Sequence, residues 1–462
     1  MRRAAILVPT LLLTACTVGP DYVRPTVDAP PDYRGALAPS TERSLGDLGW
    51  WQIFPDETLQ ALIREALARN YDVRIAATRI LEARAQVTIS RSFQLPDVRA
   101  FASAPYSRVQ GDLAPIQTRE TLAPSGGLDF AFELDLWGRF RRGSEASRAE
   151  LLSTEYGARF VASTLVSDLA TAYFRLRALD EELVIAQRTL ESRGGALDLV
   201  RKREAGGVAG MIDVRQSEIL VAGAAQTVPD IERQIEQTEN LISVLLGRPP
   251  ASVPRGRDLR AQVAAPTLPA GVPSSLLERR PDVQQAEQQL TSATARIGVA
   301  KADYFPRVFL TGAVGAGGLM VNGQMYGPQG LFSLLPSLTL PVFNAGRVGA
   351  GVDAARASAD GAMLQYQEVV LGAFRDVSDA LVEFRKRREA RLRQEELVVA
   401  AVDTTRLANL RYTNGISPYL EVLDSERQQF DAELGLVRLQ FDELAAVVRL
   451  YKALGGGWQT LP

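Results

Sequence analysis

The sequence has no histidine, a single cysteine and only four lysines among its 462 residues. Without an imidazole, the chain cannot build a Ser/His/Asp or Cys/His nucleophile system, or a histidine-containing zinc or haem site. A single cysteine allows neither an internal disulfide nor a thiolate metal cluster. No lysine follows a serine by three residues, so the Ser-x-x-Lys signature of acyl enzymes is also missing. We therefore expect no catalytic residues, no bound metal, no cofactor and no enzymatic activity.

An excess of charge of one sign and long apolar runs are absent too. The 52 basic and 54 acidic side chains give a net charge of -2, whereas a nucleic-acid-binding domain is normally strongly basic. After the N-terminal segment there is no run of about 18 or more apolar residues, so we expect no transmembrane helix. If the chain crosses a membrane, it must do so with β-strands that close into a barrel.

The N-terminus has the order of a secretory signal. Two arginines precede an apolar run over residues 4–13, and small residues then lead to Cys16. This order predicts a cleaved signal peptide over residues 1–15. The run Leu13-Thr14-Ala15-Cys16 resembles the bacterial lipobox, whose cysteine becomes the lipidated first residue of the mature protein. Cys16 is therefore the candidate for a covalent palmitate-bearing anchor, and a plain cleavage site is the alternative.

Comparison of the sequence with itself reveals a long internal repeat. At an offset of 208 residues, Gly138-Arg139 matches Gly346-Arg347 and Gly207 matches Gly415, with no gap between them. Upstream of residue 97 the offset becomes 210. Matched glycines at the ends of periodic segments are harder to obtain by chance than matched helical residues. A tandem duplication of one structural unit is therefore predicted.

Each copy is predicted to contain a helix, an extended region, a very long helix, a turn and a long return helix. In the first copy we expect one helix over residues 58–93, an extended region over 98–137 and a long helix over 138–204. The chain then divides into a signal peptide (1–15), a lipidated extended segment (16–48), a first repeat (49–250), a linker (251–273), a second repeat (274–457) and a C-terminal tail (458–462).

The long helices set the scale of the molecule. A helix over residues 138–204 would be about 100 Å long at 1.5 Å per residue, which no ordinary globular core requires. The last helix carries apolar residues at alternating spacings of three and four, the period of a coiled-coil seam. The seam residues are Leu420, Leu423, Arg427, Phe430, Leu434, Val437, Phe441, Leu444, Val448 and Tyr451. Length and duplication favour an extended coiled assembly over an amphipathic helix of a soluble bundle.

The extended regions alternate apolar and polar residues. Residues 128–136 and 332–342 alternate most clearly, and 98–107 and 308–314 are shorter partners. The stronger runs have about the length of a tilted transmembrane strand, although a half-buried soluble sheet alternates in the same way. Four strands from one chain cannot close a barrel, so several copies must pool theirs. Two copies would give a filled eight-stranded barrel, and three would give twelve strands around an open lumen.

Taken together, these features resemble the outer-membrane factors, the TolC-like exit ducts of tripartite efflux and secretion machines, in their NodT-type lipoprotein branch. The resemblance covers almost the whole chain. Besides the duplicated strand and helix units, it rests on Cys16, Gly19-Pro20-Asp21-Tyr22, Pro25, Trp50-Trp51, Phe54, Leu59, Gly138-Arg139, Gly346-Arg347, Arg411-Tyr412, Gly415, Tyr419-Leu420 and Val422-Leu423-Asp424.

The resemblance implies a mainly α-helical, tandem-duplicated TolC-like fold with transmembrane β-strands. In a homotrimer, four strands per protomer would form a shared twelve-stranded barrel above a long α-helical periplasmic barrel. The implied function is a passive outer-membrane exit duct for drugs or other small molecules in multidrug efflux, lipid-anchored and extending into the periplasm. The implied partners are outer-membrane lipid, a periplasmic adaptor (membrane fusion) protein and an inner-membrane pump, usually a proton-driven one of the resistance-nodulation-division type; nucleic acid is not among them.

The helical turns farthest from the barrel are the expected place of closure. Arg427 is the only charged residue on the seam, and Asp424, three residues earlier, is its nearest candidate partner. An exposed surface ion pair is the alternative. In resembling lipoprotein members, residues at the positions of Leu420, Asp424 and Arg427 form the constriction and its stabilising contacts, and we count Glu421 as a fourth gate residue. We predict a periplasmic gate with an apolar ring of Leu420 and a carboxylate ring of Asp424.

The resemblance also implies a latch. In the wider family, residues at the positions of Asp213 and Tyr412 link neighbouring coiled coils and hold the tip shut. Ser417 stands where some relatives carry an arginine, so the closed state is expected to depend more on Arg427.

Two charged regions allow further interpretations. The basic run over residues 385–393 is typical of a solvated helix face, with an adaptor or anionic-lipid contact as the alternative. Asp129, Glu133 and Asp135, if they face a lumen, would favour cationic solutes near the mouth.

Other functions stay open on the sequence. A type I secretion duct for proteins would use the same outer component. A lipid-anchored periplasmic adaptor would also contain long helices, but normally one helical hairpin rather than two. The exported substrate is left open by both the residues and the resemblance.

Overall fold

The computed structural model describes residues 17–34, 44–110, 119–262, 271 and 273–458. Cys16 and the predicted signal peptide lie outside these residues. The chain forms two compact units, each assembled from three segments. Unit 1 comprises Met1–Thr26, Arg79–Thr154 and Ala286–Tyr366, and unit 2 comprises Val27–Thr78, Glu155–Gln285 and Gln367–Pro462. The descriptions below treat each unit by itself.

Among the described residues, no helix combines the length and the apolarity needed to cross a bilayer.

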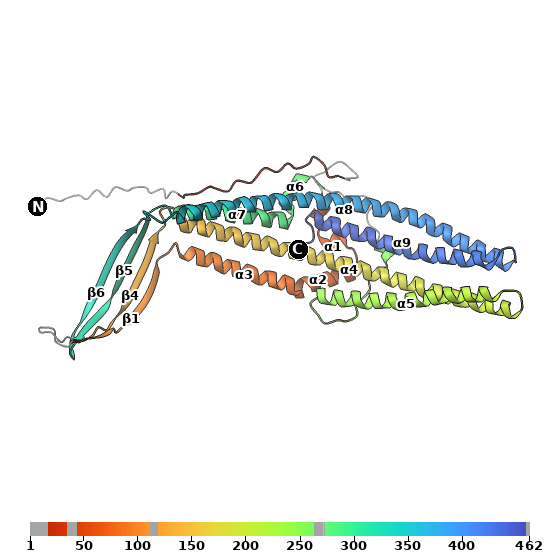
Figure 1. Ribbon diagram of the computed structural model, residues 1–462, viewed down its shortest axis with the longest axis horizontal. Coiled ribbons are helices and arrows are strands. Elements are labelled where there is room, and N and C mark those ends of the chain that lie inside the picture. Colours follow the sequence, from red (N-terminus) through yellow and green to blue (C-terminus); the bar gives the residue numbers. More distant parts are fainter. Residues whose placement is uncertain (1–16, 35–43, 111–118, 263–270, 272, 459–462) are drawn as a thin grey trace. The chain divides into compact units, whose positions relative to one another are not determined.

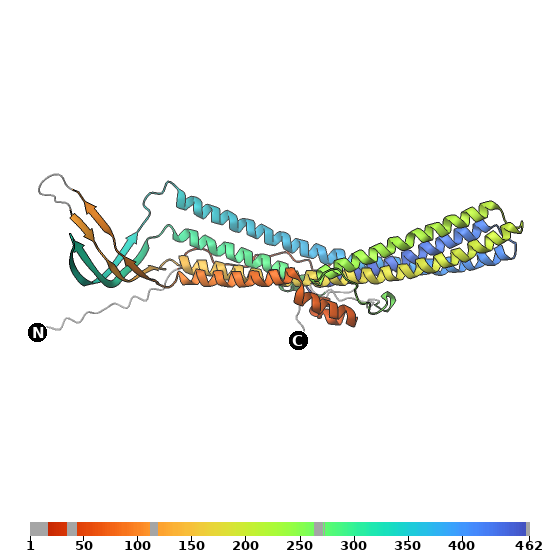
Figure 2. The ribbon, with the colours of Figure 1, turned by 90° about the horizontal axis from the view of Figure 1, so that it is seen from below.

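Unit 1 contains an antiparallel sheet built from four main strands. They are β1 (Asp97–Ser103), β4 (Ser125–Leu134), β5 (Arg307–Val321) and β6 (Gln324–Thr339), hydrogen-bonded in that order. The strands lie side by side in Figure 1, and Figure 2 shows that the sheet is curved. These strands overlap the four runs whose alternation the sequence displays. β5 and β6 begin or extend beyond the predicted runs, and β1, β4 and β6 each end a few residues before their predicted ends.

A short two-stranded ribbon that the sequence does not predict extends the sheet. β2 (Tyr106–Val109) pairs with β3 (Arg119–Leu122), and β3 meets the far end of β5 through Thr121 and Leu122. The ribbon therefore adds two short strands to the four main strands that the sequence predicts. The ribbon residues are largely charged or hydroxylated, with Arg108 beside Glu120 at 3.4 Å, so they lack the apolar alternation that identified the other strands.

Both edges of the main sheet lack a partner strand within the described residues. β1 pairs only with β4, and β6 pairs only with β5. All 16 residues of β6 are exposed in the single chain. Phe332, Leu334 and Leu338 lie on one face of β6 and expose 81%, 54% and 64% of their surface. An exposed apolar strand with free backbone groups is a surface that another molecule must cover.

The close contact of β4 with β5 depends on glycine. Gly127 faces Gly315 in the register, and a Cβ on Gly127 would lie 2.3 Å from the carbonyl oxygen of Val314. We expect Gly127→Val to separate these strands and abolish the β-sheet signal in far-UV circular dichroism of the purified protein. Gly330→Val on β6 is the matched control, since a Cβ there meets nothing within 4 Å. Equal loss in both variants would contradict this account.

Residues 17–24 are bound to unit 1 by ion pairs. Arg24 donates to both carboxylate oxygens of Glu287, at 2.8 and 2.6 Å, and Tyr22 donates to the same group at 3.0 Å. Asp21 pairs with the buried guanidinium of Arg142 at 2.5 Å. Because Glu287 is only 6% exposed, these donors compensate a carboxylate that water reaches poorly.

The predicted single helix over residues 58–93 is two helices. α2 (Glu57–Arg69) ends at Asn70, and α3 (Tyr71–Ser92) begins directly after it. The Asn70 side-chain oxygen accepts the backbone N–H groups of Asp72 and Val73, at 2.8 and 3.3 Å, and so caps the second helix. The prediction of one helix was wrong because it treated this asparagine as a helix-interior residue.

The duplication is confirmed by the helices. α4 (Arg139–Ala205) and α8 (Arg347–Thr413) each have 67 residues, and α5 (Met211–Leu245) and α9 (Tyr419–Ala453) each have 35. All four begin and end at the 208-residue offset that the sequence displays. α4 with α5, and α8 with α9, form two helical hairpins, here called hairpin 1 and hairpin 2 (Figure 1).

Short elements complete unit 2 and the connections between the copies. These are η1 (Leu45–Asp47), α1 (Trp50–Ile53), η2 (Leu259–Gln262), α6 (Pro273–Arg279) and, extending from unit 2 into unit 1, α7 (Pro281–Ala302). Both η1 and η2 contact α9.

The predicted coiled-coil seam is buried for most of its length. Leu423, Phe430, Leu434, Val437, Leu444, Val448 and Tyr451 expose at most 9% of their surface. Three seam positions differ: Leu420 is 60% exposed, the Arg427 side chain is 64% exposed, and Phe441 is only partly buried. In the single chain, Arg427 is thus exposed, as in the alternative that the sequence leaves open.

Asp56 holds three segments of unit 2 together. Its carboxylate accepts the N-terminal N–H groups of α2, the Tyr173 hydroxyl at 3.0 Å, the Arg257 N–H at 2.9 Å and the Gln262 amide at 3.0 Å. Asp56 is only 1% exposed. This single side chain thus fixes α2, the long helix α4 and the segment that follows the first repeat.

Candidate functional site

The two hairpin turns have the same backbone conformation. Gly207 and Gly415 adopt φ values of +73° and +70°, which glycine tolerates without strain. The N–H of Val208 then bonds to the Arg203 carbonyl, and that of Ile416 to the Arg411 carbonyl, at 2.8 and 2.9 Å. This Schellman closure satisfies the last carbonyls of α4 and α8 and reverses the chain within a few residues. The predicted turns are therefore confirmed.

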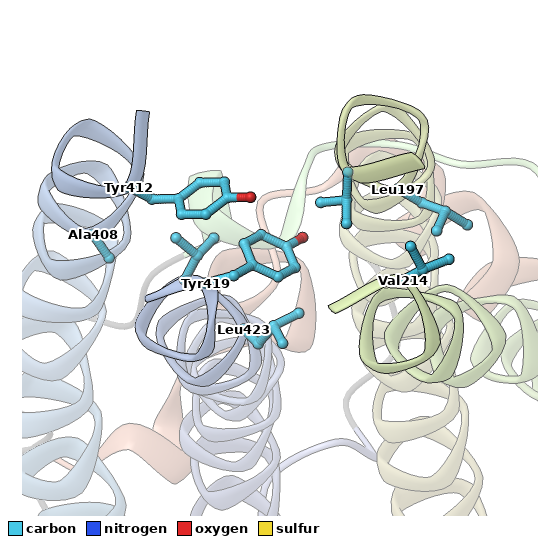
Figure 3. Close-up of a cluster of buried hydrophobic side chains, with 8 residues drawn as sticks. Leu197, Val214, Ala408, Tyr412, Tyr419 and Leu423 are labelled. Atoms are coloured by element: carbon cyan, nitrogen blue, oxygen red, sulfur yellow. The ribbon is translucent and has the colours of Figure 1, made fainter. Parts of the chain in front are cut away.

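Behind the turns, the two hairpins share an apolar cluster. Figure 3 shows Leu197 and Val214 of hairpin 1 facing Tyr412, Tyr419 and Leu423 of hairpin 2. Every one of these residues exposes less than a tenth of its surface. Close to the turns, no backbone connection joins the two hairpins. The packing of this apolar cluster therefore holds them against each other.

Two tyrosines occupy the centre of the cluster. Their rings lie 4.8 Å apart at 44°, and the Arg203 guanidinium lies 4.4 Å from the centre of the Tyr412 ring. The Ser217 hydroxyl donates to the Tyr419 hydroxyl at 3.1 Å. Burial raises the pKa of both tyrosines above the ordinary value. Tyr419 is among the residues that carry the family resemblance, but neither it nor Ser217 nor Arg203 was predicted as a site residue, because their spacing does not distinguish them from other helical residues.

The two predicted latch residues both lie at this end of the hairpins. The Asp213 carboxylate accepts the Gly210 N–H at 3.1 Å and so caps α5. The Tyr412 hydroxyl is buried and has no hydrogen-bond partner within the part of the chain that the structure describes. Asp213 still contributes to the raised pKa of Tyr412, behind burial and the opposing effect of Arg203. Within one chain, the two side chains are neighbours without a hydrogen bond.

The predicted gate residues form an exposed stripe on α9. Leu420, Asp424 and Arg427 follow one another at spacings of four and three, which places them on one face of the helix. Arg427 donates to Asp424 at 2.6 Å, and both side chains are about half exposed or more. This is the surface ion pair named as the alternative in the sequence analysis. Glu421 lies off this stripe and pairs with Arg411 of α8 at 3.4 Å.

The acidic residues near the strands do not form a free acidic surface. Glu133 pairs with Arg139 at 2.6 Å, and Asp129 lies 3.6 Å from Arg99. Asp135 accepts the N–H groups of the first turn of α4, at 3.2 and 2.9 Å. The expectation of three carboxylates available to cationic solutes overlooked these partners, and Asp135 has a capping role.

The basic run on α8 is largely paired with acidic side chains. Lys386 bonds to Glu389, Arg387 to Asp442, and Arg393 to Glu396. These contacts agree with a solvated helix face. Among the described residues, no group of three or more carboxylate, thiolate or imidazole side chains is placed to hold a metal ion.

A family model described as "Outer membrane efflux protein" matches the chain twice, over residues 62–248 and 272–456. The two matches cover most of the chain and follow the two structural copies. The chain belongs to the outer membrane efflux protein family. Like other members of this family, it is an outer-membrane channel of a tripartite efflux system, and it is not an enzyme.

Individual relatives match over nearly their full length. The "toluene efflux pump outer membrane protein TtgC" of Pseudomonas putida is 35% identical, over 98% of this chain and 95% of that protein. The "cation efflux system protein CusC" of Escherichia coli is 32% identical, over 97% of each. The open-state crystal structure of the Neisseria gonorrhoeae MtrE outer-membrane channel has a TM-score of 0.87 and 33% identity, over 96% of this chain and 99% of that one. The predicted TolC-like fold is thereby confirmed.

Proposed function

We propose that the chain works as a homotrimeric exit duct whose opening is controlled at the hairpin turns. One observation carries the proposal: the main sheet of unit 1 ends in two strands, β1 and β6, that have no partner among the described residues. Free strand edges cannot persist in a bilayer, because unpaired backbone groups in hydrocarbon cost several kcal/mol each. The β6 edge of one copy would pair with the β1 edge of the next.

Three copies give a barrel of suitable size. Four main strands per chain make twelve strands in a trimer, enough for an open lumen, whereas the eight strands of a dimer would be filled by side chains. The apolar face of β6, with Phe332, Leu334 and Leu338, would then contact lipid or the neighbouring strand. In this proposal residues 49–250 and 274–457 are the two repeats that each protomer contributes.

The gate would be built from the exposed stripe of α9. Three copies of Leu420 would form an apolar ring, and three copies of Asp424 a carboxylate ring, with Arg427 holding each carboxylate in place at 2.6 Å. Glu421 would keep α9 against α8 through Arg411. The Tyr412 hydroxyl and Asp213 would form the latch, completed by a small shift of the hairpins when they meet their neighbours in the trimer.

A lipid on Cys16 would anchor the N-terminus in the outer membrane. Residues 17–24, which directly follow it, are held on unit 1 by Glu287 and Arg142. The anchor would therefore remain beside the unit that carries the strands. The proposed partners are a periplasmic adaptor protein at the hairpin turns and an inner-membrane pump of the proton-driven resistance-nodulation-division type.

The proposed cargo is small molecules. Relatives of similar identity are named for efflux of toluene and of cations, so the shared structure accommodates more than one kind of solute. A type I secretion duct would instead pass an unfolded protein through the same outer component.

The test is complementation in a strain that lacks its own efflux ducts. With the matching adaptor and pump present, the chain should restore export of a fluorescent dye and migrate as a heat-sensitive trimer in outer-membrane fractions. The Cys16→Ser variant is expected to lose labelling by a palmitate analogue. A monomeric, bilayer-free protein would refute the duct, and secretion of a protein substrate without dye export would favour the type I alternative.

A further inference from the structure

A small cavity lies in unit 2, between α8, α9 and the short helix η2, which contacts α9. Its volume is about 280 Å³, at the lower end of the range for small-molecule sites. Three leucines line it: Leu259 of η2, and Leu436 and Leu444 of α9. Leu259 and Leu444 are buried, and Leu436 is partly buried. The cavity therefore has apolar walls that can cover an aliphatic group.

Gln440 of α9 brings an amide to this cavity. Its side-chain oxygen is buried and has no hydrogen-bond partner among the described residues. A buried acceptor without a donor is unfavourable, and such groups in folded proteins normally have a partner. The last bond of a glutamine side chain rotates readily, so the amide can turn its oxygen toward a donor in the cavity.

A buried ion pair forms another wall of the cavity. The Glu443 carboxylate, only 3% exposed, pairs with the Nε of Arg391 from α8. The Nη1 of Arg391 bonds to Glu395 at 2.5 Å. Taking charged groups out of water is costly, and replacing such a pair with apolar residues is often neutral or stabilising. The stability of hairpin 2 alone therefore does not explain why these charges are present.

The first repeat provides an internal comparison. At the 208-residue offset, Leu183 stands in the place of Arg391, and Ile235 in the place of Glu443. The counterpart of Gln440 is Glu232, which is exposed. The helices of hairpin 1 nevertheless have the same lengths as those of hairpin 2. A hairpin of this length thus forms without the polar groups, which points to a separate role for them in hairpin 2.

We infer that this cavity is a binding site for a small neutral aliphatic amide. The Gln440 side chain carries one carbonyl and one NH₂ group. Another amide matches both, because its N–H donates to the carbonyl and its own carbonyl accepts from the NH₂ group. The three leucines remove the aliphatic part of the ligand from water. The site lies within one chain, so the inference does not depend on the proposed duct.

The charges around the cavity favour an uncharged ligand. Arg391 already pairs with both Glu443 and Glu395, and Arg260, which also lines the cavity, lies 2.9 Å from Glu181. A ligand carboxylate would meet two carboxylates while both arginines are paired, which is unfavourable. A neutral amide leaves these ion pairs intact.

The experiment is ligand-observed NMR on the full-length, detergent-solubilised protein, with N-acetyl-leucinamide as the probe. We expect saturable binding at one site per chain, with a Kd of about 1 mM or lower. N-acetyl-leucine has a carboxylate in place of the terminal amide, and it should bind at least about tenfold more weakly.

Two variants and a matched control locate the binding. Gln440→Met keeps an unbranched side chain without the amide and should weaken binding at least about tenfold. Its thermal stability should equal or exceed that of the wild type, because the buried unpartnered oxygen is gone. Leu436→Phe narrows the cavity and should weaken binding as well. Glu232→Gln, at the equivalent position of hairpin 1, should bind as the wild type does.

Two results would overturn the inference. One is the absence of saturable binding to the wild-type protein. The other is equal binding to the wild type and to folded Gln440→Met, which would show that the probe associates elsewhere, for example with the detergent. Neither result would affect the proposed duct, which is tested by trimer formation and dye export.

Discussion

Replacing Asp56 with alanine should lower the free energy of unfolding by about 4 kcal/mol. The carboxylate is almost fully buried and accepts hydrogen bonds from Tyr173, Arg257, Gln262 and the start of α2. Alanine leaves several buried donors without an acceptor, and each unsatisfied group costs about 1 to 3 kcal/mol. Denaturant unfolding of the detergent-solubilised protein, followed by far-UV circular dichroism, measures the change.

A neighbouring residue provides the control for this substitution. Glu57→Ala removes an exposed acid from the first turn of the same helix and should change stability by no more than about 0.5 kcal/mol. Asp56→Asn should fall between the two, because the amide keeps one acceptor but turns an N–H group toward other donors. A stability of Asp56→Ala equal to that of Glu57→Ala would show that the buried network does not support unit 2.

Combining Asp424→Ala with Tyr412→Phe should increase the single-channel conductance several-fold. The first change removes the proposed carboxylate ring and frees Arg427 from its ion pair. The second removes a hydroxyl that has no hydrogen-bond partner within the described part of the chain, so it should leave the stability of the protomer unchanged. Any opening caused by Tyr412→Phe would then report on a contact made only in the assembled, closed channel. Planar-bilayer recording and dye leakage in intact cells measure the effect.

Tyr419→Phe separates gating from packing. This tyrosine lies in the same cluster, but its hydroxyl already has Ser217 as a partner in the chain. The variant should lower thermal stability slightly and leave the conductance at the wild-type value. If Asp424→Ala with Tyr412→Phe conducts no more than the wild type, the assignment of these residues to the gate and latch is refuted.

The hairpins could be predicted from the sequence because local signals and periodicity agree there. Gly207 and Gly415 mark the turns, and the 208-residue offset ties the two hairpins together, so the helix ends were placed within a few residues. The buried part of the seam followed from the same period, as Phe430 and Val437 illustrate. The family model and the solved relatives then confirmed the fold and the efflux function.

Other features depend on contacts that no local pattern encodes. The break at Asn70 was missed, although its counterpart at the upstream offset precedes Pro281, and proline is favoured at the first position of a helix. The exposure of Arg427 depends on which face of α9 packs against the other helices. The spacing of apolar residues defines a stripe on α9, but it does not determine whether every position of that stripe is buried. Asp135 was interpreted by its charge, whereas its hydrogen bonds make it the cap of α4.

The equal lengths of the two hairpins restrict how this protein can change in evolution or by design. One extra residue in α8 alone would rotate everything beyond it by about 100° and advance its turn by about 1.5 Å. The turn of α8 would then no longer face that of α4. Insertions and deletions should therefore be tolerated only as matched whole heptads, added to both helices of both hairpins, so that the duct can vary in reach without losing register.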